Sequence, residues 1–139
     1  MLIVIVSLPL LVVFTTCSKE KQMLLNNTWK VLYIETDTNY SILEESIRHR
    51  PITLSIIEMV NATDKFVFKL NSGTEIWGKV KIKNNKINFQ NVETIDGLNS
   101  SFMQYFANLL GEIDRYETLG LFLFFTGNNE EKMKLVRDY

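Results

Sequence analysis

The chain has 139 residues, with 15 lysines and arginines against 16 aspartates and glutamates, and its formal net charge is −1. This balance excludes the basic footprint of a nucleic-acid-binding protein. The chain has one cysteine, which excludes an intramolecular disulfide. It also has only one histidine, so too few cysteine and histidine ligands are present for a structural zinc site. We therefore expect no nucleic-acid partner, no metal and no cofactor, and a fold stabilised by its apolar core.

The chain opens with an uncharged apolar run from Leu2 to Phe14. This run is shorter than the roughly 20 residues that a helix needs to span a bilayer, and it suits the apolar region of a secretory signal peptide. Two threonines and Cys17 follow, an ending that resembles the lipobox of bacterial lipoproteins. The resemblance implies a signal peptide at 1–16, cleavage before Cys17 and lipidation of that cysteine.

Two alternatives remain open for this segment: an ordinary secretory signal with an incidental cysteine, and a short uncleaved anchor. A lipoprotein would have the membrane as a partner through its lipid anchor, a lipidated tether at 17–24 and one folded domain at 25–139. Ser18 follows the cysteine, where an Asp would retain lipoproteins of the enteric type at the inner membrane. The resemblance therefore favours the outer membrane of a bacterial cell envelope.

After the tether, about 120 residues are enough for one domain with a sizeable core. A first strand is predicted at 29–34, with Trp29, Val31 and Tyr33 on one face. The polar segment 37–50 is predicted as a loop with a short helix. Apolar patterns predict further strands at 52–57, 65–70, 75–82 and 86–92. Asn84 and Asn85 join the last two in a tight hairpin, since asparagine tolerates positive φ.

A helix capped by Ser100 or Ser101 is predicted next, because apolar residues recur there at helical spacing. Its apolar stripe consists of Phe102, Tyr105, Phe106, Leu109, Leu110 and Ile113. Strands at 116–118, 121–125 and 132–137 complete the chain. The elements together predict an α+β fold: a strongly curled antiparallel β-sheet of about seven or eight strands, with one long amphipathic helix packed on it.

Three stretches carry a resemblance to a known family: the opening 25–30, the hairpin from Gly78 to Phe89, and the ending from Phe102 to Arg137. They resemble the META domain of bacterial envelope lipoproteins, which include a heat-inducible group, over residues 24–137. Members often carry two cysteines around the central hairpin, and this chain has neither, so no functional residue carries over. The lipocalin-like lipoproteins, which share the Thr-Trp-Lys opening and form a ligand-holding barrel, are the alternative.

Few residues suggest chemistry. His49 lies between Arg48 and Arg50, and these two cations make it a poor general base. We therefore favour a histidine on a solvated loop over a catalytic histidine. Trp77 points to the face of the sheet opposite to that of Ile76 and Gly78. On that face it either anchors a partner or is covered by the rest of the fold.

These observations predict a protein that is not an enzyme, a monomeric envelope lipoprotein whose domain serves binding or envelope maintenance. Its candidate binding residues are Trp77, Arg48 and His49, and its partner is an unknown envelope protein or a small ligand. The alternative function is that of a carrier that holds a small hydrophobic ligand in a barrel lined by aromatic side chains.

Overall fold

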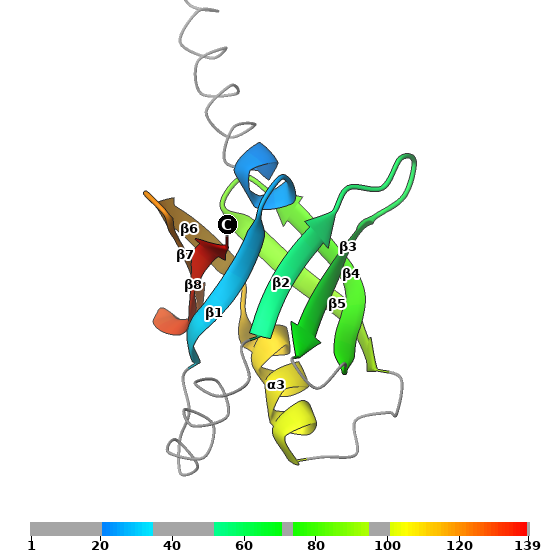
Figure 1. Ribbon diagram of the computed structural model, residues 1–139, viewed down its shortest axis with the longest axis vertical. Helices are drawn as coiled ribbons and strands as arrows, with labels where there is room; N and C mark the ends of the chain where they lie inside the picture. Colours follow the sequence, from blue (N-terminus) through cyan, green and yellow to red (C-terminus); the bar gives the residue numbers. More distant parts are fainter. Residues whose placement is uncertain (1–20, 35–51, 71–73, 95–100, 139) are drawn as a thin grey trace, which may run out of the picture.

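The computed structural model describes residues 21–34, 52–70, 74–94 and 101–138. Eight antiparallel strands pair in chain order, and the last also pairs with the first, so the sheet closes into a barrel (Figure 1). The predicted α+β class with a curled antiparallel sheet is confirmed. The strands are β1 (Thr28–Ile34), β2 (Ile52–Ile57), β3 (Asp64–Leu70), β4 (Glu75–Lys83), β5 (Lys86–Thr94), β6 (Arg115–Leu119), β7 (Phe122–Gly127) and β8 (Glu130–Asp138).

The barrel interior is apolar because each strand turns alternate side chains inward. The largest fully buried rings are those of Trp29, Phe66, Phe68, Phe106 and Phe125. Phe68 on β3 meets Phe106 edge to face, with 4.9 Å between ring centres and 81° between ring planes. Such aromatic pairs stabilise a core beyond the area that they bury. Phe106 belongs to helix α3 (Ser101–Glu112), so this helix contributes to the same core as the sheet.

Helix α3 lies where the barrel ladder is interrupted. Strands β5 and β6 share one register pair, Lys86 with Arg115. Beside it, the backbone N–H of Ile87 donates to the carbonyl of Asp114 at 3.2 Å, and the N–H of Asp114 donates to the carbonyl of Thr126 at 3.0 Å. The rest of β5 has no strand on that side within the described residues, and α3 contacts β5 instead.

The position of Tyr33 differs from the prediction. Val31 pairs with Leu135 and Tyr33 pairs with Lys134, so Leu32 is an extra residue in β1, a β-bulge. The bulge reverses the alternation after Val31, which leaves Tyr33 exposed and turns Ile34 into the core. The prediction that Tyr33 shares the inner face with Trp29 was wrong, because a sequence pattern does not show a bulge.

The packed structure begins within the segment that was predicted as a tether. Residues 21–25 form a short helix, and Leu24 is fully buried in the core cluster. The indole Nε1–H of Trp29 donates to the carbonyl of Leu24 at 3.4 Å, and the amide of Asn27 donates to the carbonyl of Met23 at 2.7 Å. These contacts fix the short helix against the barrel. The predicted loop at 37–50 lies outside the described residues.

The two ends of the barrel differ. The start of β1, the end of β8 and three turns (58–63, 84–85 and 120–121) lie at one end, because neighbouring strands run in opposite directions. The short helix approaches the same end, uppermost in Figure 1, which we name the tether end. In the described part of the chain, no helix is long and apolar enough to cross a membrane.

Candidate functional site

The outer surface of β3, β4 and β5 carries a row of lysines. Lys79, Lys81 and Lys83 take three successive outward positions of β4 and are exposed, while Val80 and Ile82 between them are buried. Two further lysines lie on the neighbouring strands. We name the five residues together the basic strip: Lys65, Lys79, Lys81, Lys83 and Lys86.

Strand register brings the basic strip together. Lys65 on β3 lies directly opposite Lys79, and Lys86 on β5 lies directly opposite Lys83. Like charges at opposed positions of an antiparallel pair destabilise the sheet. The five lysines concentrate positive charge on one side of the barrel, although the net charge of the chain is −1.

Trp77 occupies the outward position of β4 that precedes Lys79. Its neighbour Ile76 is fully buried on the inner face, and Trp77 itself is partly buried on the outer face. The outward orientation that the sequence predicted is therefore correct. Trp77 lines an open groove of about 450 Å³, which we name the Trp77 groove. The other residues that line it are Lys65, Gly78, Lys79, Asn91, Val92 and Glu93.

A β-bulge shapes the Trp77 groove. Trp77 pairs with Glu93 while Lys79 pairs with Gln90, so β5 has one extra residue here, and Asn91 has a positive φ of 53°. A Cβ on Gly78 would lie 2.5 Å from the carbonyl oxygen of Gln90 and 2.8 Å from that of Asn91. Only glycine permits this close backbone approach.

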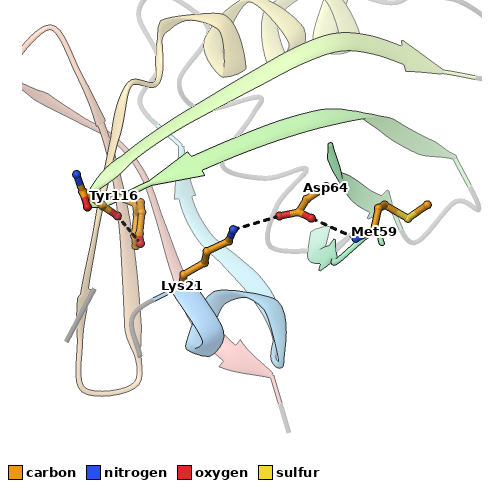
Figure 2. A network of polar contacts seen from close by, with 5 residues as sticks. Lys21, Met59, Asp64 and Tyr116 are labelled. Carbon is orange, nitrogen blue, oxygen red and sulfur yellow. Dashed lines mark hydrogen bonds and ion pairs between the residues drawn. The ribbon is translucent and has the colours of Figure 1, made fainter. Parts of the chain in front are cut away.

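A second groove, of about 610 Å³, opens at the tether end between the 58–63 turn and the end of β4. Its central carboxylate is Asp64, whose side chain is 12 % exposed. Asp64 Oδ1 accepts the backbone N–H of Met59 at 3.1 Å, and Oδ2 lies 3.8 Å from Lys21 Nζ (Figure 2). Asp64 thus links the turn, the barrel and the short helix, which is a structural role.

Among the described residues, Lys132 is the one charged residue that is buried. Its Nζ lies 3.5 Å from Glu112 Oε2 at the end of α3 and 3.5 Å from Glu130 Oε2 at the start of β8. A buried ammonium needs such partners, because burial alone penalises its charge. The contacts join α3 to β8, and we assign Lys132 to the fold.

The other candidate residues from the sequence, Cys17, Arg48 and His49, lie outside the described residues. Within the described ranges, no group of three His, Cys, Asp or Glu side chains could hold a metal ion. Sequence reasoning named Trp77 as a candidate but did not predict the basic strip. The Lys-x-Lys-x-Lys pattern at 79–83 was the available signal, since alternate strand residues share one face.

No family model matches this chain, and no curated protein matches it. Its fold is similar to the crystal structure of a DUF4847 family protein from Bacteroides vulgatus, with a TM-score of 0.58 and 12 % sequence identity. The match covers 85 % of this chain and 96 % of that protein. At this identity the likeness shows a common fold.

Proposed function

We propose that this protein is a non-enzymatic lipoprotein of the bacterial envelope, anchored at the outer membrane through Cys17, whose META-like domain binds an acidic partner on its outer surface. The observation that carries the proposal is the position of Trp77 beside Lys65 and Lys79 in one groove. Tryptophans are favoured anchors of binding energy, and complementary charge steers a partner and fixes its orientation. The partner would present an apolar group next to carboxylates or phosphates.

The packed interior supports binding on the outside of the barrel. Trp29, Phe66, Phe68 and Phe125 are fully buried, and a side chain with no accessible surface borders no space that would hold a water molecule. Interiors of this kind are packed as densely as organic crystals. A ligand placed against these four rings would have to displace them.

The anchor is tested by the intact mass of the mature protein from a bacterial host, beside that of a Cys17→Ser variant. We expect a wild-type chain that begins at Cys17 and carries acyl groups, and a variant without acyl groups that is not cut at this position. A wild-type chain that is cleaved and free of lipid would contradict the anchor.

The binding surface is tested by photo-crosslinking in cells. A photoreactive residue at Glu93 lies in the Trp77 groove, and one at Glu117 provides a matched control, since both glutamates are exposed and Glu117 lies on β6. We expect a specific adduct from position 93, lost in Trp77→Ala and in Lys65→Gln/Lys79→Gln, and not formed from position 117. The same adduct from both positions, or one that persists in Trp77→Ala, would refute binding in the groove.

The alternative function is that of a lipocalin-like carrier of a small hydrophobic ligand. Closure of the barrel around aromatic side chains favours it, because small barrels can enclose one ligand. Titration of the purified protein with a fluorescent fatty acid tests this function. Saturable binding at one site that is unaffected by Trp77→Ala would favour the carrier over surface binding.

Arg48 and His49 remain binding candidates in the proposal, since function often resides on loops. We expect His49→Ala to reduce the crosslink from position 93 only if this histidine contributes to the same surface. An unchanged crosslink would remove His49 from the binding site.

A further inference from the structure

The tether end of the barrel carries most of the exposed apolar side chains. Seven large apolar residues are exposed in the described part of the chain, and five of them lie at this end. Val60, in the turn between β2 and β3, is 87 % exposed, and Leu119 and Leu121, which flank Gly120 between β6 and β7, are 65 % and 46 % exposed. The five are Ile57, Val60, Leu119, Leu121 and Phe122.

Both turns are held by hydrogen bonds. The backbone N–H of Arg137 at the end of β8 donates to the carbonyl of Leu121 at 2.9 Å. The 58–63 turn is tied by Asp64, which accepts the N–H of Met59 and pairs with Lys21 (Figure 2). The apolar tips therefore project from fixed positions. Exposed apolar residues gathered at one end mark a contact surface more strongly than residues scattered singly.

The short helix fixes where the chain leaves the barrel. Lys21 begins the described structure at the tether end, and Cys17 lies only four residues before it. Four residues span at most about 14 Å, even when fully extended. A lipid on Cys17 would therefore keep this end of the barrel close to the membrane surface.

From these observations we infer that the tether end docks on the bilayer, with the tips at Val60 and at Leu119–Leu121 inserted among the lipid headgroups. The inference rests on the proposed anchoring at Cys17. Apolar side chains gain free energy when they enter the boundary between headgroups and acyl chains. Exposed Lys83 and Lys86 flank the 84–85 turn at the same end, where their charges suit anionic headgroups. Docking also leaves the Trp77 groove on the barrel flank, open to a partner.

The experiment uses the full lipidated protein in vesicles of phosphatidylethanolamine and phosphatidylglycerol. Val60→Cys and Leu121→Cys introduce a free thiol for a nitrobenzoxadiazole label, since acylation blocks Cys17. Leu32→Cys is the matched control: Leu32 is 44 % exposed, as Leu121 is 46 % exposed, but it lies toward the opposite end of the barrel. We expect nitroxide-labelled lipids to quench the labels at 60 and 121 several-fold more than the label at 32.

Vesicle flotation and intact mass separate the two proposals. Protein that is acylated and floats with the vesicles, but shows equal or no quenching at the three positions, would overturn the docking while leaving the anchor intact. Protein that lacks acyl groups and does not float would overturn the anchor and, with it, the docking.

Discussion

Trp29 and Arg137 lie opposite each other in the ladder between β1 and β8, and the guanidinium carbon of Arg137 is 5.9 Å from the centre of the Trp29 ring. The same indole donates its N–H to the carbonyl of Leu24 in the short helix. Trp29 thus joins three elements: the short helix, the first strand and the last strand. Closure of the barrel brings these distant segments together around one side chain.

We expect Trp29→Ala to lower the free energy of unfolding by about 3–5 kcal/mol, as large-to-small changes of buried aromatic residues do. Leu32→Ala on the same strand should change it by less than about 0.5 kcal/mol, because Leu32 is exposed. Urea denaturation of both variants and the wild type measures the difference. Similar losses in the two variants would show that Trp29 is not central to barrel closure.

We expect substitution of glycine by alanine to have opposite effects on stability at two positions, Gly78 and Gly111. Gly78→Ala should lower the free energy of unfolding by about 1–3 kcal/mol, because its Cβ would collide with the backbone oxygens of Gln90 and Asn91. Gly111 lies within α3, and an added Cβ would meet no atom within 4 Å apart from its own stretch of helix, so Gly111→Ala should raise stability by about 0.5–1 kcal/mol. Thermal or urea unfolding gives both values. Destabilisation by both substitutions would contradict this assignment.

Asp64 combines a hydrogen bond and an ion pair, and two substitutions separate them. Asp64→Ala removes both contacts, and we expect a loss of about 1–2 kcal/mol, most of it from the acceptor for the Met59 N–H. Asp64→Asn retains an acceptor, and Lys21→Ala removes only a partly exposed pair, so each should cost less than about 1 kcal/mol. A loss in Lys21→Ala as large as that in Asp64→Ala would identify the ion pair as the main contribution.

Tyr116 anchors the turn between β4 and β5. Its hydroxyl donates to the carbonyl of Asn84 at 2.8 Å (Figure 2), and Asn84 has a positive φ of 57°. The backbone N–H of Tyr116 donates to the carbonyl of Asn85 at 3.0 Å. Tyr116→Phe should cost about 0.5–1.5 kcal/mol, the usual net value of one hydrogen bond.

Amide hydrogen exchange localises the effect of Tyr116→Phe. We expect faster exchange at the N–H groups of Tyr116 and Ile87 and no change in the ladder between β1 and β8. An equal increase in both regions would indicate a global rather than a local loss.

The strand pattern illustrates what sequence reasoning reached. The predicted strand 52–57 agrees with β2, and the predicted strand 65–70 lies within β3, where Phe66 and Phe68 are buried. The side of the sheet on which Trp77 lies was also predictable, because alternate residues of a strand face opposite ways. The bulges at Leu32 and Asn91 were not, since each inserts one residue against a partner strand that the local pattern does not contain.

The sequence by itself determined the elements of this protein: the apolar opening before Cys17, the strands, the helical stripe around Phe106 and the asparagine hairpin. These signals are local, because they follow from backbone periodicity and from the φ values that each residue tolerates. The tertiary structure alone decided that β8 closes on β1, that lysines of three strands form one strip, and that apolar turns gather at the tether end. Those features depend on register between distant segments, which packing of the whole core selects.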